Sequence, residues 1–273
     1  MKKLVTIADW ADDSLTCQEH RSTVNGFLKQ SQNADIHYVG STPSTIHGAF
    51  LLSQIVETEE RYGSPLETVI FLNVDPRLHT EDAVENARGA ELLIIKLQSG
   101  VYIIGPNAGY DFSMIKNKIG MSFTYPGLAE GSQFRSRDLY ARICAHLMDE
   151  MEDELELEET STNVIPELTG YHLVHVDNFG NLKTNIKHSY FKGKHEEKAM
   201  VKIKIGPVEK SVKYVNNMFG TVSGDLVVYP GSSGIKSDPF LEITIRRTFL
   251  EEKPATGWEE FKFPRPGTKI EIQ

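Results

Sequence analysis

Residues 68–75 read Thr68-Val69-Ile70-Phe71-Leu72-Asn73-Val74-Asp75, an apolar and β-branched run that stops at an acidic residue. This pattern is typical of a β-strand. Four further segments in the first half of the chain are predicted as strands, namely 3–8, 35–39, 92–97 and 101–104. Helical periodicity in 44–61 and 137–151 predicts helices. We therefore expect an α/β N-terminal domain with a mostly parallel sheet.

Polar or glycine-rich residues follow three of these predicted strands. Segment 3–8 runs into Asp9, segment 68–74 runs into Asp75, and segment 101–104 runs into Gly-Pro-Asn-Ala-Gly at 105–109. A single Asp at a strand end usually forms a turn. Parallel strands, however, bring their carboxyl ends to one edge, where open α/β sheets bind ligands. Three such ends favour a ligand site, without naming a reaction.

The second half of the chain has a different pattern. Short strands are predicted at 171–176, 197–205, 210–214, 225–229, 240–246 and 268–272. Such a series indicates a smaller all-β domain, either a barrel or a sandwich. The acidic run 148–159 and the polar residues 160–163 are interpreted as a solvated helix end and a connector. The expected domains are therefore 1–160 and 167–273.

A polar stretch at 175–186 reads His-Val-Asp-Asn-Phe-Gly-Asn-Leu-Lys-Thr-Asn-Ile. Asp177 offers a carboxylate, Asn181 and Asn185 offer amides, and Gly180 allows a tight turn. One interpretation is a ligand loop for a purine or an amino-acid head group. The other is a hairpin whose side chains cap their own turn. The stretch taken alone leaves both open.

Composition excludes several classes of protein. The formal net charge of −9 over 273 residues argues against a nucleic-acid surface. No apolar run is long enough to cross a bilayer, and residues 1–7 do not form a signal peptide, so we expect a cytoplasmic protein. Cys17 and Cys144 have no metal-site spacing, and the Asp9, Asp12 and Asp13 group does not match a calcium loop. No metal or cofactor is predicted.

Several short motifs are each too unspecific to identify a family, but their order along the chain is informative. They are Ala8-Asp9 with Asp12-Asp13-Ser14, Thr42-Pro43, Val74-Asp75-Pro76, Gly105-Pro106-Asn107-Ala108-Gly109, Phe134-Arg135-Ser136-Arg137-Asp138, Ala145-His146-Leu147, Asp177-Asn178-Phe179-Gly180-Asn181, Thr184-Asn185-Ile186, Phe219, Ser232 with Gly234, and Leu241-Glu242-Ile243. Together they resemble the S-adenosylmethionine (SAM) hydroxide adenosyltransferases and their fluorinase and chlorinase relatives.

The resemblance implies a homotrimer that binds SAM between neighbouring subunits. Asp9 would accept hydrogen bonds from both ribose hydroxyls, and Asp177 and Asn181 would hold the methionine portion. Phe219 would flank the adenine. The other substrate-binding candidates are Asp12, Ser14, Phe134, Ser136 and Ser232. The implied reaction is displacement at the ribose 5′ carbon by water or halide, in which methionine leaves.

The sequence departs from this family at the residues that would handle water. Hydroxide-transferring members use an Asp-Arg-His set, of which only Asp75 is present. Asp82 stands where the Arg is expected and Arg135 where the His is expected, and neither has the chemistry of the residue it replaces. Halogenating members lack the carboxylate, which would repel halide.

Arg77 and His79 follow Asp75 closely and are candidates to restore the set. The candidate catalytic residues are therefore Asp75, Arg77, His79 and Arg135. We expect hydrolysis of SAM to adenosine and methionine. The alternatives are a non-catalytic SAM or adenosine binder, acting as a sensor or sink, and a structural trimer with vestigial pockets.

Overall fold

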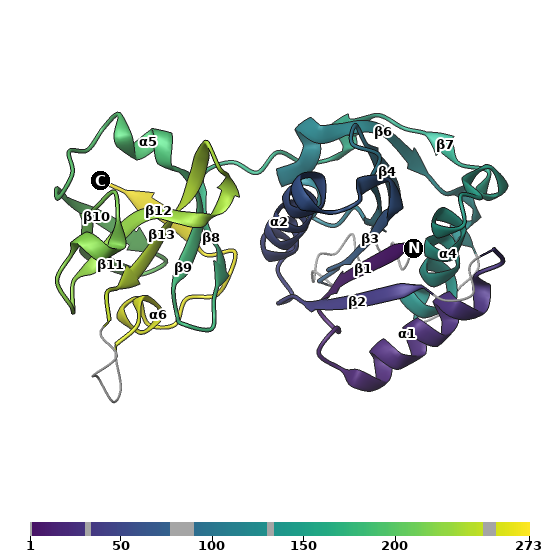
Figure 1. Cartoon of the computed structure of the whole chain (residues 1–273), viewed down its shortest axis with the longest axis horizontal. Helices are drawn as coiled ribbons and strands as arrows, with labels where there is room; N and C mark the ends of the chain where they lie inside the picture. Colours follow the sequence, from purple (N-terminus) through teal and green to yellow (C-terminus); the bar gives the residue numbers. More distant parts are fainter. Residues whose placement is uncertain (1, 31–33, 77–89, 130–133, 248–254) are drawn as a thin grey trace. The chain divides into compact units, whose positions relative to one another are not determined.

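The computed structural model describes residues 2–30, 34–76, 90–129, 134–247 and 255–273. The chain divides into two compact units, Met1–Leu168 and Thr169–Gln273. The first contains a sheet with helices and the second an all-β barrel, as Figure 1 shows. The predicted pairing of an α/β domain with a β domain is confirmed. None of the helices in the described ranges combines the length and the apolar character needed to cross a bilayer.

The sheet of the first unit has a parallel half and an antiparallel half. Its strand order is β2 (Asp35–Gly40), β1 (Lys3–Ala8), β3 (Thr68–Asn73), β5 (Tyr102–Pro106), β4 (Leu92–Leu97), β6 (Ile119–Thr124) and β7 (Glu158–Glu159). Neighbours from β2 to β5 are parallel, and the pairings of β4 and β6 are antiparallel. All five predicted strands are present. The sheet is mixed because β4, β6 and β7 add an antiparallel half.

Helices cover both faces of this sheet (Figure 1). Val69 and Phe71 of β3 pack in a core that includes α1 (Ser14–Phe27) and α4 (Ala141–Met148). Ile70 and Leu72 point the other way, into a core that includes α2 (Thr45–Tyr62). A strand with both faces covered must be apolar at every position, which explains the continuous run at 68–72.

The structure contains one helix that was not predicted, and one predicted helix needs correction. Helix α1 was not expected, since its buried positions are Cys17, His20 and Val24, a weak apolar pattern. The helix expected over 137–151 is a π-helical turn, Ser136–Tyr140, followed by α4, and it ends at Met148. The acidic run beyond it is not a solvated helix end. It forms a 3₁₀ turn, Glu152–Leu155, which buries Leu155, and then strand β7.

The second unit is a closed barrel. Its order is β10 (Met200–Ile205), β11 (Val208–Tyr214), β12 (Leu226–Ile235), β13 (Asp238–Ile245), β9 (Leu182–Lys187), β8 (Tyr171–Val176) and β14 (Lys269–Ile272), with short helices α5 (His188–Lys192) and α6 (Gly257–Glu260). Strand β9 lies inside the stretch interpreted above as a ligand loop. Leu182, Thr184 and Ile186 alternate into the core, so only residues 177–181 form the turn.

Candidate active site

The parallel strands bring the predicted strand ends to one edge. In the β1–β3 register Ala8 lies opposite Asn73, and the Asp9 N–H donates to the Asn73 carbonyl at 3.4 Å. β5 runs parallel to β3 on its other side. Asp9, Asp75 and the loop that follows β5 therefore lie at the carboxyl edge of the sheet. The predicted arrangement of these three strand ends is confirmed.

This edge is acidic and partly desolvated. Burial raises the pKa of Asp9, a hydrogen bond from its own backbone opposes this, and the charge of Asp75 raises it further. Asp111, in the loop after β5, is 1% exposed. Burial raises the pKa of Asp111 well above its usual range, and Asp75 and then Asp9 add to the effect. The charge of Asp75 therefore reaches both Asp9 and Asp111 at this edge.

The segment 134–140 lies against the same edge. The side-chain amide of Asn73, the last residue of β3, donates to Ser136 Oγ at 2.6 Å. The pKa of Tyr140 is raised by burial, lowered by Arg135 and raised by Asp75, so both charges reach the same phenol. The Phe134 ring lies edge-on to Trp10, with centroids 5.9 Å apart. Phe134, Arg135 and Ser136 are thus gathered near Asp9 and Asp75.

The residues after Asp9 divide between ligand candidates and a helix cap. Asp13 caps α1, accepting from Leu15 N at 3.0 Å and Thr16 Oγ1 at 2.7 Å. Ser14 is exposed at the first position of the helix. The Asp12 carboxylate covers Gly40 at the end of β2, where a Cβ would lie 2.5 Å from Asp12 Oδ1. Asp12 therefore lies beside the carboxyl end of a fourth parallel strand.

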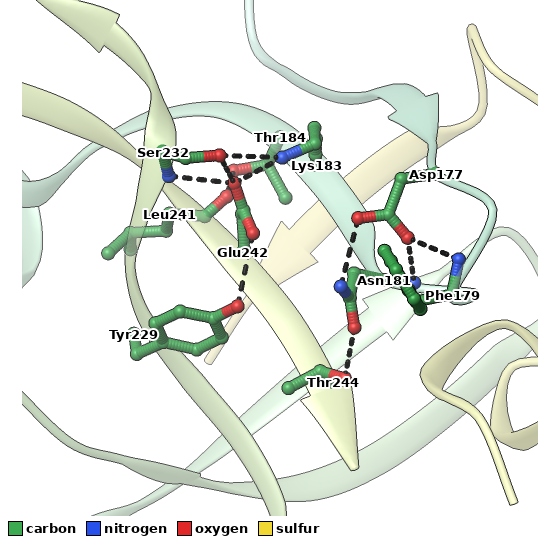
Figure 2. A network of polar contacts seen from close by, with 10 residues as sticks. All are labelled: Asp177, Phe179, Asn181, Lys183, Thr184, Tyr229, Ser232, Leu241, Glu242 and Thr244. Carbon is green, nitrogen blue, oxygen red and sulfur yellow. Dashed lines mark hydrogen bonds and ion pairs between the residues drawn. The ribbon is translucent and has the colours of Figure 1, made fainter. Parts of the chain in front are cut away.

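The turn between β8 and β9 is organised by Asp177 (Figure 2). Asp177 Oδ1 accepts from the N–H groups of Phe179 and Asn181, at 2.9 and 3.0 Å, and Oδ2 accepts from the Asn181 amide at 2.9 Å. Thr244 Oγ1 on β13 donates to Asn181 Oδ1. The self-capped hairpin is therefore present. It also holds Asp177 and Asn181 in a fixed orientation, so it does not exclude a ligand role.

A second polar network in the barrel has Glu242 at its centre (Figure 2). Glu242 Oε1 pairs with Lys183 Nζ at 2.5 Å and accepts from Ser232 N at 2.9 Å and Ser232 Oγ at 3.1 Å. Tyr229 OH donates to Glu242 Oε2 at 3.1 Å. Burial, followed by the charge of Glu242, raises the pKa of Tyr229. Ser232 is thereby fixed at the barrel wall.

Phe219 lies on a short 3₁₀ turn, Met218–Gly220, and its side chain is 74% exposed. Its N–H donates to Asn217 Oδ1 at 2.9 Å, and its carbonyl accepts from Arg246 Nη1 at 2.7 Å. The backbone of this turn is held by hydrogen bonds while the Phe219 ring remains exposed.

Sequence reasoning missed Asp111 because the glycine-rich loop was taken to end at 109. An acidic residue just before the buried Phe112 was the available signal. It also missed Asn73, Trp10, Thr244 and the central position of Glu242. Arg77, His79 and Asp82 lie outside the described residues.

The fold and these two polar groups define a protein with an α/β unit and a β-barrel unit, each presenting side chains suited to a small polar ligand. Residues 171–253 match the model of the SAM hydroxide adenosyltransferase C-terminal domain. The (R)-S-adenosyl-L-methionine hydrolase of Methanocaldococcus jannaschii is 26% identical over 232 residues, which cover 80% of this chain and 77% of that protein. The second unit of the chain thus matches a SAM hydroxide adenosyltransferase domain, and the chain over most of its length is similar to a SAM hydrolase.

Solved structures share the fold. An uncharacterized conserved protein from Thermotoga maritima aligns over 99% of this chain and 100% of its own, with a TM-score of 0.73 and 17% identity. A conserved hypothetical protein from Thermus thermophilus aligns over 100% of both chains, with a TM-score of 0.65 and 16% identity. At these identities the likeness concerns the fold alone.

Proposed function

We propose that this protein hydrolyses SAM to adenosine and methionine. The observation that carries the proposal is the parallel register of β1 and β3, which brings Asp9 and Asp75 together at the carboxyl edge of the sheet. One carboxylate is available for a ribose diol and the other for water. The match of residues 171–253 to the SAM hydroxide adenosyltransferase domain and the similarity to the SAM hydrolase named above support the same reaction.

The reaction is a displacement in which the residues position the groups. The water oxygen forms a bond to the ribose 5′ carbon, the bond from that carbon to sulfur breaks, and its electron pair stays on methionine as a neutral thioether. One proton leaves the water. In the proposed site Asp9 accepts from the ribose hydroxyls, Asp75 accepts the water's hydrogen, and Ser136 supplies a further polar contact.

The barrel unit supplies the amino-acid and base contacts in this proposal. Asp177 uses three acceptor positions internally, which leaves one of the roughly four on a carboxylate for the methionine ammonium. Asn181 is oriented for the carboxylate portion. The exposed ring of Phe219 flanks the adenine, and Ser232 contributes a hydroxyl. Asp12, Ser14 and Phe134 remain proposed substrate contacts at the sheet edge.

Arg135 is proposed to balance charge at the edge. Its field and that of Asp75 both reach Tyr140, so a guanidinium lies close to the acidic group. The proposed reaction needs no metal or cofactor, because a sulfonium is already a good leaving group. Arg77 and His79 remain sequence-based proposals for catalysis.

We also propose a cytoplasmic homotrimer in which SAM lies between subunits. The residues proposed for the ribose and those proposed for the methionine portion fall on different units of the chain, which is the support for a site that two subunits complete. Both cysteines, Cys17 and Cys144, are free thiols, as expected in a reducing compartment.

The test is product analysis by chromatography after incubation with SAM. Wild type should release adenosine and methionine in equal amounts, and Asp75→Asn should lower kcat at least 100-fold while SAM still binds. Added fluoride or chloride should give no halogenated nucleoside, since Asp75 repels an anion. Tight binding by wild type without adenosine would instead identify a sensor or sink, and a halogenated product would overturn the account of Asp75.

A further inference from the structure

Asp111 is a buried acidic side chain of the described sheet edge that the proposed reaction does not yet use. It is 1% exposed, and neither carboxyl oxygen has a hydrogen-bond partner among the described residues. Buried polar groups are nearly always paired, and a buried, unpaired charge is strongly unfavourable. An unpaired carboxyl group in this position either destabilises the folded protein without serving a function or forms a hydrogen bond to a group that binds with the substrate.

The surrounding elements are built to admit this carboxyl group. Asp111 N donates to the Ala108 carbonyl at 3.2 Å, and Tyr110 N donates to Thr45 Oγ1 at 3.2 Å, which docks the loop on the start of α2. A Cβ at Gly48 of α2 would lie 2.9 Å from Asp111 Oδ1, 3.2 Å from Val74 Cγ2 and 3.3 Å from Leu72 Cδ1. Glycine is unfavourable inside a helix, and its use here lets α2 pack closely against both the carboxyl group and β3.

The charges around Asp111 determine its protonation. Asp75, at the end of β3, and Asp9, at the end of β1, are the groups whose charges reach it, and α2 presents the uncharged Gly48. Burial and two negative neighbours act in the same direction and favour the neutral acid. A neutral carboxylic acid carries an O–H donor, which neither Asp9 nor Asp75 supplies as a carboxylate.

We propose that Asp111 is a further catalytic residue, a neutral carboxylic acid that donates a hydrogen bond to the attacking water while Asp75 accepts a hydrogen from it. The inference rests on the proposed hydrolysis. It gives the site a hydrogen-bond donor at the water, a role that the carboxylate of Asp82, where the resemblance implies a guanidinium, would not supply. The water's remaining lone pair then points at the ribose 5′ carbon, and Asp111 keeps its proton throughout.

Two substitutions separate the donor from the volume of the side chain. Asp111→Asn keeps a donor of similar size, and we expect kcat within about threefold of wild type near neutral pH. Asp111→Val removes the donor, and we expect kcat to fall at least 30-fold with KM changed less than threefold. Thr6→Val is the matched control, because Thr6 on β1 is also fully buried with an unpartnered hydroxyl. It should retain wild-type kcat.

The pH dependence of kcat separates the proposed role from a packing role, because a change in packing alone would not alter it. Wild-type kcat should decrease as pH rises through the pKa of Asp111, and this alkaline decline should be absent in Asp111→Asn. Folded Asp111→Val with wild-type kcat would overturn the role, as would equal loss in both variants. A wild type that releases no adenosine removes the proposed function and this role together.

Thermal unfolding tests the protonation without any turnover. Because the pKa of Asp111 is raised in the folded state, its stabilising effect is complete below the unfolded pKa and is lost as pH rises through the folded value. The Tm of Asp111→Asn minus that of wild type should therefore increase from pH 5 to pH 9. A difference that stays constant would show that Asp111 is already ionised and contradict the proposal.

Discussion

At the scale of single residues, the predictable part of the site is the part at strand ends. Asp9 and Asp75 each terminate an apolar run, so their placement follows from strand direction and needs no side-chain detail. Asp111 is different. Its burial depends on how a loop packs against Gly48 of α2, a contact between segments 63 positions apart, and no local pattern encodes that contact.

Asp9 is expected to dominate binding of the nucleoside. Charge-assisted hydrogen bonds contribute about 1.5–3 kcal/mol each, so Asp9→Ala should weaken SAM binding at least tenfold. Calorimetry in an Asp75→Asn background measures affinity without turnover. Asp13→Ala is the control, since Asp13 caps α1 and has no proposed ligand contact. Equal affinities for the Asp9 variant and its parent would remove Asp9 from the site.

At the scale of elements, strands were predictable where apolar residues are dense. Strand β9 was hidden because Lys183, Asn185 and Lys187 alternate with its three core residues, and the polar half was interpreted as ligand chemistry. Helix α1 was hidden because Cys17 and His20 fill core positions. In both elements tertiary burial, and not local composition, decides the structure.

Removing one partner of the buried Lys183–Glu242 pair should destabilise the barrel more than replacing both partners. Their side chains are 13% and 4% exposed, so Lys183→Met leaves a buried charge without its partner, at a cost of about 3–5 kcal/mol. The exposed pair Lys204–Glu271, at 36% and 47%, provides the control. Lys204→Met should cost less than about 1 kcal/mol.

Denaturant unfolding followed by tryptophan fluorescence checks this prediction. The chain has two tryptophans, Trp10 and Trp258, so a Trp10→Phe background leaves a single reporter in the barrel unit. The double variant Lys183→Met/Glu242→Gln should recover part of the loss. If Lys183→Met and Lys204→Met lower the free energy of unfolding equally, the buried Glu242 network stabilises the barrel no more than an exposed ion pair does.

At the scale of the whole molecule, an α/β half and a β half could be recognised from composition, whereas barrel closure could not. Closure depends on β14 at the end of the chain pairing with both β8 and β10. The parallel β11–β12 neighbours and the antiparallel half of the first sheet depend in the same way on long-range register.

The proposed assembly predicts a mass three times the 30.7 kDa of one chain. Light scattering coupled to size exclusion measures it, with and without SAM. A trimer should persist in Asp75→Asn, because that residue is assigned to water and not to subunit contacts. A monomer that still binds SAM tightly would contradict a site completed by a neighbouring subunit.

Strand β7 has a consequence for solubility. A closed barrel exposes no unpaired strand, so the first sheet, with β2 and β7 at its two ends, is where another chain could add by backbone hydrogen bonding. At one end the sheet stops with a strand of two residues, Glu158 and Glu159, both exposed. A short, negatively charged edge strand repels the same edge strand of another molecule. The acidic residues of β7 therefore oppose edge-to-edge aggregation at that side of the sheet.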